Sequence, residues 1–172
     1  MRTIKFRGKD IETGEWVYGQ LFQRLYQCPA IIEQRPHNGN VMYYEIAVDD
    51  ETVGQFTGVL DKNGKEIYEG DIIQYTSTDS YVVNPDCDPH LHFTHNYAKT
   101  YQDVVIFHDG IFTIEDDDNF LPLCCCGCDD IETLRACVDL GDDYVDVNGT
   151  VIDESLLGIE VIGNIHDNKN IL

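Results

Sequence analysis

The sequence has little positive charge: 11 lysines and arginines stand against 32 aspartates and glutamates, which gives a formal net charge of −21. Proteins that bind DNA or RNA directly use Lys and Arg to neutralise the phosphates, and a surface this acidic repels them. The composition therefore argues against direct binding of nucleic acid. It favours a protein partner with a basic surface, because a negative face attracts and steers a positive one.

Long hydrophobic runs are also absent. No apolar segment has the length of a membrane span, and the basic residues of Met1–Arg7 are not followed by the apolar region of a signal peptide. We therefore expect a cytoplasmic protein without membrane association. A chain of 172 residues with 42% hydrophobic residues is long enough to bury a core without disulfides. No Gly/Ser-rich or Pro-rich linker divides it, so we predict a single unit over 1–172.

The motifs of familiar enzymes are missing as well. The chain has no Gly-Xaa-Ser-Xaa-Gly elbow, no Walker loop and no dinucleotide fingerprint, and Asp61–Gly64 lacks the further ligands of a calcium-binding loop. The many carboxylates nominate no particular catalytic pair. We therefore predict a protein that is not an enzyme, with no catalytic residue and no cofactor.

The seven cysteines are an odd number, and four of them crowd into Cys124–Cys128, where adjacent residues do not pair easily. This pattern argues against a secreted disulfide framework. Reduced cysteine is among the most buried residue types, and so packing is the expected role of the cluster.

A metal site is the main chemical alternative. One segment carries four zinc-competent side chains, and the cysteine cluster could add thiolates; the four are Cys87, His90, His92 and His95. Their spacing does not match the paired knuckles of structural zinc sites, so an exposed polar loop with incidental histidines is the competing interpretation. We assign no metal ligand on this basis.

The clearest structural signal lies between Thr52 and Ile73. Asn63-Gly64 is a strong hairpin signal, because both central residues of a type I′ turn need positive φ. Apolar residues flank it on both sides, Gly70 lies at a second bend, and a β-branched run follows. The segment therefore predicts strand, turn, strand, bend and strand. Its expected core residues are Phe56, Ile67, Tyr68, Ile72 and, from the end of the chain, Ile162.

Further strands are predicted on both sides of this segment. The chain begins with a hairpin around the Thr13-Gly14 turn, and Asp109-Gly110 is a second two-residue hairpin candidate. Short strands are expected at 28–32 and 41–48, with an exposed loop at 35–40 between them. The region 76–101 has no sustained period and is predicted to be an inserted loop. A second insertion, 116–157, holds at most one short helix at 131–140.

Several of these segments resemble the YopX family of phage and prophage proteins. The segments with similar sequence are Ile4–Asp10, Thr13–Gly19, Glu66–Ile72 and Ile159–Asn168. The resemblance implies a mainly β fold, with N-terminal β-hairpins over 1–50 and an SH3-like barrel in the C-terminal part, 51–172, interrupted by long loops near 76–101 and 116–157. It supplies no activity, and the shared motifs suit framework residues.

The sequence thus predicts a phage or prophage accessory protein of a bacterial host cell that binds a host or phage protein without catalysis. The acidic residues between Asp116 and Asp146, with Arg135 the one basic residue among them, are the predicted binding surface. Two alternatives remain open: a metal-binding protein that uses the Cys87/His90/His92/His95 loop, and an acidic mimic of DNA. Self-association is also left open.

Overall fold

A computed structural model describes residues 3–23, 27–83, 93–116, 119–123, 126–127, 130–140 and 145–168. Within these residues the fold is mainly β, as predicted, with a single α-helix. The elements in chain order are β1 (Phe6–Lys9), β2 (Trp16–Phe22), β3 (Ala30–His37), β4 (Asn40–Ala47), η1 (Asp50–Thr52), β5 (Gly54–Leu60), β6 (Glu66–Tyr68), β7 (Asp71–Val83), β8 (Phe93–Val104), β9 (Ile106–His108), β10 (Ile111–Asp116), β11 (Asn119–Pro122), α1 (Ile131–Cys137), η5 (Glu154–Leu156) and β12 (Glu160–Asn164).

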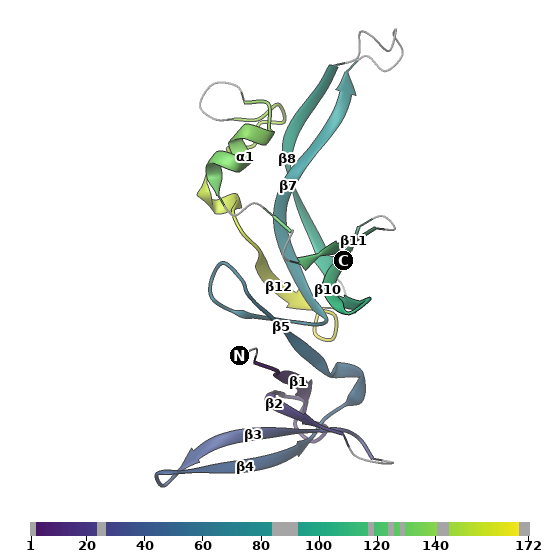
Figure 1. Cartoon of the computed structure of the whole chain (residues 1–172), viewed down its shortest axis with the longest axis vertical. Coiled ribbons are helices and arrows are strands. Elements are labelled where there is room, and N and C mark those ends of the chain that lie inside the picture. Colours follow the sequence, from purple (N-terminus) through teal and green to yellow (C-terminus); the bar gives the residue numbers. More distant parts are fainter. Residues whose placement is uncertain are drawn as a thin grey trace.

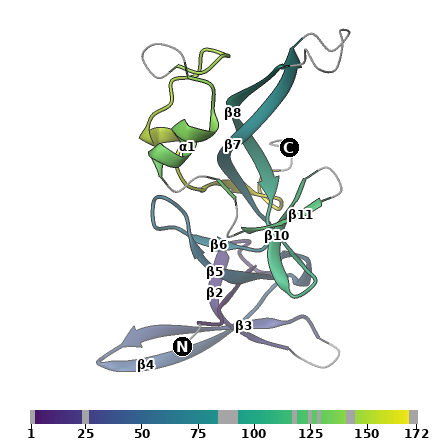
Figure 2. The ribbon, with the colours of Figure 1, turned by 45° about the horizontal axis from the view of Figure 1, so that its top comes forward.

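The strands form three sheets that are stacked along an elongated molecule (Figure 1). The first has the order β4-β3-β2-β1-β5-β6, the second β11-β10-β9, and the third β12-β7-β8. The β3–β4 hairpin lies at one end and the β7–β8 hairpin at the other, as Figure 2 shows from a second direction. Among the described residues every sheet is open and no barrel closes. The SH3-like barrel is therefore not confirmed.

The predicted turns are present at the expected places. Antiparallel strands β5 and β6 flank residues 63–64, and Ile67 and Ile72 are fully buried, as predicted. The turn itself is not type I′. Gly64 has φ +81°, but Asn63 lacks positive φ, and the loop closes through Asp61 N–H to Lys65 C=O instead. Asp109-Gly110 does have positive φ at both residues and joins β9 to β10 as a two-residue hairpin.

Two predicted loops are wrong. Residues 35–40 belong to a continuous hairpin, because β3 and β4 pair up to His37 and Asn40 around an Asn38-Gly39 turn. The region 76–101 is also not a loop where the structure describes it: β7 runs to Val83 and β8 begins at Phe93. These strands pair mainly with each other rather than with the core, so their polar sequences carry no apolar alternation.

Most of the buried hydrophobic residues fall into three clusters. The largest draws its side chains from all three sheets and contains Ile67, Ile73, Tyr75, Val105, Phe112, Ile114, Leu123, Cys126 and Val161. Of the predicted core residues, Phe56, Ile67, Tyr68 and Ile72 are buried. Ile162 is only half-buried, because a register shift between Val161 and Gly163 places Val161 against Ile73 instead.

The predicted short helix is confirmed as α1. Leu134 is its buried residue, and it packs with Ala98 of β8, Val138 and Ile152 in a second cluster. No helix in the described part of the chain is long and apolar enough to cross a membrane.

The distal β7–β8 hairpin offers a test of this architecture. The Asn96 N–H donates to the Asp139 carboxylate and the Asn96 C=O accepts from the Asp139 N–H, so the backbone groups of Asn96 point away from β7. Because backbone groups alternate in direction along a strand, those of the neighbouring His95 point towards β7 and bond to Tyr81. We predict that an Asn-Gly turn in place of 82–94 changes the unfolding free energy by less than about 1 kcal/mol, or about 2–4 °C in Tm. Thermal denaturation followed by circular dichroism measures this. Loss of cooperative unfolding would show that the removed tip supports the fold.

Candidate functional site

The segments that carry the shared sequence motifs meet at one place in the fold. Arg7 of β1 reaches β7, where its Nη1 lies 2.6 Å from the Asp71 Oδ1, and both residues are almost fully buried. The guanidinium also stacks 4.6 Å from the ring centroid of Trp16, and its Nη2 donates to the Glu69 carbonyl at 3.1 Å. We call this region the motif junction; its members are Lys5, Arg7, Lys9, Trp16, Tyr18, Glu66, Tyr68, Asp71, Asn164, His166 and Asp167.

The turn after β12 joins the same region. The Trp16 Nε1–H donates to Asp167 Oδ2 at 2.7 Å, and Lys9 forms an ion pair with the other carboxylate oxygen. Asn164 Nδ2 donates to Asp167 at 2.8 Å. The turn after β12 is thus fixed onto the N-terminal hairpin, with Trp16 as one of its anchors.

The electrostatics of the motif junction are satisfied internally. Burial raises the pKa of the Asp71 carboxyl, while Arg7 and the Tyr68 N–H act in the opposite direction. Burial, together with Arg7 and Lys9, lowers the pKa of His166 and keeps its ring neutral near pH 7. Since its charged groups are paired within the fold, we interpret the motif junction as a framework rather than a binding site.

Removing the guanidinium should show how much the stability of the fold depends on the pair of Arg7 and Asp71. We predict that Arg7→Met costs about 3–5 kcal/mol of unfolding free energy, because it leaves Asp71 as a buried, unpaired carboxylate. Arg7→Met combined with Asp71→Asn should cost clearly less, because it removes both charges and keeps an acceptor for the Tyr68 N–H. Urea denaturation measures both variants. Equal losses for the single and double variants would contradict the assignment.

Asp167 gives a pH-dependent prediction. Hydrogen bonds from Asn164, Lys9 and Trp16 hold the pKa of this carboxyl well below its usual range. A carboxyl with a depressed folded-state pKa stabilises the fold above its unfolded pKa of about 3.9, and this contribution is lost as pH falls towards the folded value. Asp167→Asn should therefore have a smaller unfolding free energy than wild type at pH 7, and the difference between the two proteins should decrease below about pH 4. Fluorescence of Trp16, the one tryptophan of the chain, follows the unfolding.

A second region has the form of a binding site. Two adjoining hollows of about 340 Å³ and 300 Å³ lie between the β5–β6 hairpin and the β9–β11 sheet, and both are lined by Val59 and Leu123. We call them together the β5–β10 groove. The remaining lining residues are Thr57, Leu60, Asp61, Lys62, Gly110, Ile111, Phe112, Pro122, Cys126, Gly158 and Ile159.

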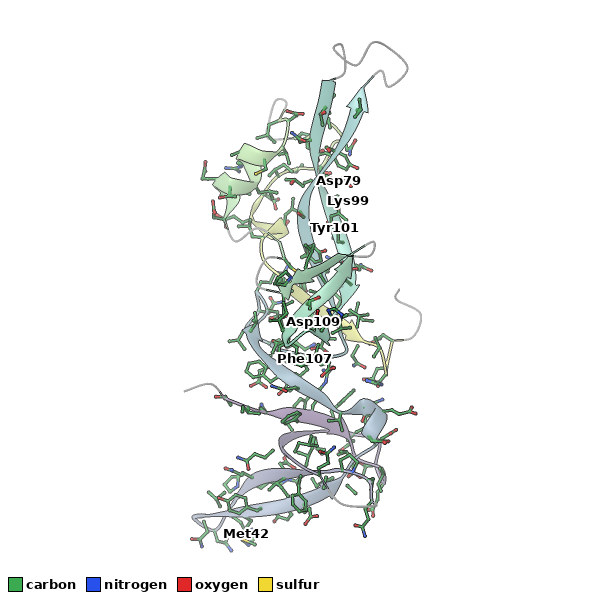
Figure 3. The ribbon with its side chains drawn as sticks, turned by 45° about the vertical axis from the view of Figure 1, so that its right-hand side comes forward. Met42, Asp79, Lys99, Tyr101, Phe107 and Asp109 are labelled. Atoms are coloured by element: carbon green, nitrogen blue, oxygen red, sulfur yellow. The ribbon has the colours of Figure 1, made fainter. Side chains whose placement is uncertain are left out.

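Exposed apolar side chains lie in the groove and on the strands next to it: Leu60 and Ile111 line the hollows, and Phe107 and Leu121 lie on β9 and β11, which flank β10. Leu60, Phe107, Ile111 and Leu121 are between 37% and 55% exposed, although each is large and hydrophobic. Phe107 packs on the buried Phe112 with ring centroids 5.0 Å apart and lies close to Asp109 (Figure 3). Grouped apolar exposure of this kind is typical of binding surfaces. Sequence reasoning missed the groove because four distant segments build it.

The polar groups of the groove serve the fold. Burial raises the pKa of Asp61, but N–H donors from Lys65, Val161 and Asn63 outweigh it, and the net pKa is lowered. The thiol of Cys126 is buried and donates to the Pro122 carbonyl at 3.6 Å. The arrangement therefore suits binding of apolar side chains by contact.

Three of the four candidate metal ligands lie in the part of the chain that the structure does not describe. Cys87, His90 and His92 lie outside the described residues, and His95 Nδ1 is 3.5 Å from Asp139 on the flank of β8. Within the described ranges, no three His, Cys, Asp or Glu side chains gather as a metal site would require. In the cysteine cluster, Cys126 packs in the largest core, as expected, whereas Cys124, Cys125 and Cys128 are not described.

The predicted acidic surface is only partly described, and its described carboxylates have structural partners. Asp130 caps α1 by accepting from the Thr133 N–H at 2.8 Å. Asp146 is buried and accepts from the Ala98, Asn148 and Thr150 N–H groups. Asp117, Asp118, Asp129, Asp142 and Asp143 lie outside the described residues, and of Asp116 only the backbone, at the end of β10, is described.

The comparison with protein families agrees with the motifs. Residues 5–172 match the family described as YopX protein. A crystal structure of protein EF1440 from Enterococcus faecalis is similar with a TM-score of 0.47 and 22% identity, over 100% of this chain and 99% of that one. No curated protein matches the chain.

Proposed function

The chain belongs to the YopX family, and from that premise we propose that it is a phage or prophage accessory protein that binds another protein, without catalysis, through the β5–β10 groove. The observation that carries this proposal is that two large apolar side chains, Leu60 and Ile111, are exposed where they line two adjoining hollows. Protein interfaces combine such an apolar centre with a polar rim.

The charge of the chain favours a basic partner. At a net charge of −21, the protein attracts basic surfaces and repels nucleic acid. Asp109 stands beside Gly110 and Ile111 at the groove with a side chain that is 89% exposed. A partner segment that carries Lys or Arg next to Leu, Ile or Phe would match both the rim and the hollows. The cytoplasm of a bacterial host is the proposed location.

The SH3-like arrangement of the C-terminal part belongs to the same proposal. Side chains of β6, β7, β10 and β12 surround one core, although they come from different sheets. Strands that wrap around a shared core are typical of small barrels, in which strands from two sheets meet at the corners. In this arrangement the β5–β10 groove lies on the outside of that core.

Charge is the first property to test. The tagged protein is used to capture proteins from lysogenic or infected cells, and each captured protein is then purified and measured alone. We predict that association weakens as salt is raised from about 0.05 to 0.5 M, because salt screens exposed charges. Replacing Asp116, Asp117, Asp118, Asp142 and Asp143 by Asn should slow association more than it speeds dissociation. An unchanged rate and salt dependence would place the binding site away from these carboxylates.

The groove is tested by paired variants. Leu60→Ser with Ile111→Ser removes two exposed apolar side chains at the groove and should weaken the same complex about tenfold or more. The matched control is Val82→Ser with Val151→Ser, since these residues have comparable exposure elsewhere and line neither hollow. Surface titration or calorimetry measures both proteins. If both pairs of variants weaken binding equally, or neither does, the groove is not the site.

A further inference from the structure

The β3–β4 hairpin continues beyond the sheet that anchors it. β2 pairs with β3 only at Ala30–Ile32, so residues 33–44 form a two-stranded arm that reaches away from the rest of the molecule (Figures 1 and 2). We call residues 33–44 the β3–β4 arm. Its second strand exposes both faces: Val41, Met42, Tyr43 and Tyr44 are between 40% and 66% exposed. Met42 is labelled near the tip in Figure 3.

The register shows which backbone groups of the arm face outwards. His37 and Asn40 flank the two-residue turn, so the odd-numbered residues of β3 bond to the even-numbered residues of β4. The hydrogen bond from the Val48 N–H to the Pro29 C=O follows the same pattern, since it joins an even-numbered residue after β4 to an odd-numbered residue before β3. The N–H and C=O groups of Val41 and Tyr43 therefore point away from β3, at the outer edge of the described sheet.

The two edges of the arm differ. On the β3 side, Pro36 removes an outward-facing donor, and Glu33 and Arg35 add charges. Prolines and charges of this kind are how proteins prevent edge strands from pairing with other chains. The outer edge of β4 has no such protection between Val41 and Tyr44. Its base is covered differently, because the Ile11 N–H donates to the Ala47 carbonyl.

The arm is also free of net charge in a highly acidic protein. Glu33 and Arg35 are its two charged residues with His taken as neutral, so its formal charge is zero against −21 for the chain. A basic partner gains nothing from such a surface. An apolar, uncharged strand edge is best matched by another of the same composition, and the arm itself provides one.

We propose that the occupant of the β4 edge is a second copy of this chain, paired antiparallel across a two-fold axis at Met42. Val41 of each copy then exchanges both backbone hydrogen bonds with Tyr43 of the other. Val41 and Tyr43 stack across the strands on one face, and the two Met42 side chains meet on the other between the Tyr44 rings. This register places no carboxylate opposite another.

The electrostatics of this contact differ from those of the proposed basic partner. The two bodies repel each other at long range, and the arm keeps them apart, so screening favours the dimer. Self-association should therefore strengthen as salt is raised, whereas binding of a basic protein weakens. The paired edge is small, so the dimer should form and dissociate with concentration. The two proposals can thus fail independently.

A cysteine at position 42 tests the register directly. In the proposed dimer Met42 faces Met42 in a non-hydrogen-bonded pair, with Cα atoms about 4.5 Å apart, which is within disulfide range. With oxidised glutathione as electron acceptor, Met42→Cys should give a covalent dimer at least about tenfold faster than Gln34→Cys, because pairing raises the effective thiol concentration. Gln34 is exposed and lies directly opposite Tyr43, but it belongs to β3, and its backbone groups face the edge of the arm away from β4.

Wild-type protein reports any background from the native cysteines, and peptide mapping must find the 42–42 link. Equal rates for the two cysteine variants would overturn the proposal. Sedimentation velocity across a concentration series adds a reversible measurement, in which Tyr43→Pro should abolish self-association while Gln34→Pro, which removes a donor at the same level of the opposite edge, leaves it intact. Monomeric wild-type protein at high concentration and high salt would also overturn it.

Discussion

The buried pair between Arg7 and Asp71 is the constraint on which the rest of the structure depends. Two charges taken out of water are stable only if each finds its counter-charge and its remaining hydrogen bonds inside the protein. Arg7 meets most of this demand with Asp71, the Glu69 carbonyl and the ring of Trp16, although its buried Nε–H has no hydrogen-bond partner among the described residues. The pair therefore helps to orient the N-terminal hairpin, together with the pairing of β1 with β5, and places the guanidinium beside the bend at Gly70.

The middle and the two ends of the molecule differ in how many side chains they bury. The middle holds the motif junction and the largest core, where strands from all three sheets share buried side chains. The β3–β4 arm and the β7–β8 hairpin extend from it in opposite directions (Figure 1), but they differ in burial: β4 of the arm is mostly exposed, whereas β7 and β8 supply Ile73, Tyr75 and Ala98 to the buried clusters. An element that contributes little to the core can present surface without cost to the fold, and the arm, on which Val41, Met42, Tyr43 and Tyr44 are exposed, is such an element.

The sequence predicted features that depend on neighbouring residues and missed those that depend on distant ones. Asp109-Gly110 and Gly64 mark turns because positive φ is a local demand. The strands at 76–83 and 93–101 were missed because each is stabilised mainly by its neighbour, so their sequences show no apolar face. The groove was equally invisible, since Val59, Ile111, Leu123 and Gly158 are brought together only by the fold.

The acidity of the chain has a structural component that composition alone does not show. Asp49, Asp61, Asp130, Asp146 and Asp153 each accept hydrogen bonds from backbone N–H groups at a turn or at the start of a helix. Aspartate is favoured there because its short side chain reaches the free N–H groups that begin such elements. Part of the net charge of −21 is therefore a consequence of how the turns are built. The charge makes many basic proteins attractive, and the groove must supply the selectivity among them, because shape and apolar fit distinguish partners that charge alone does not.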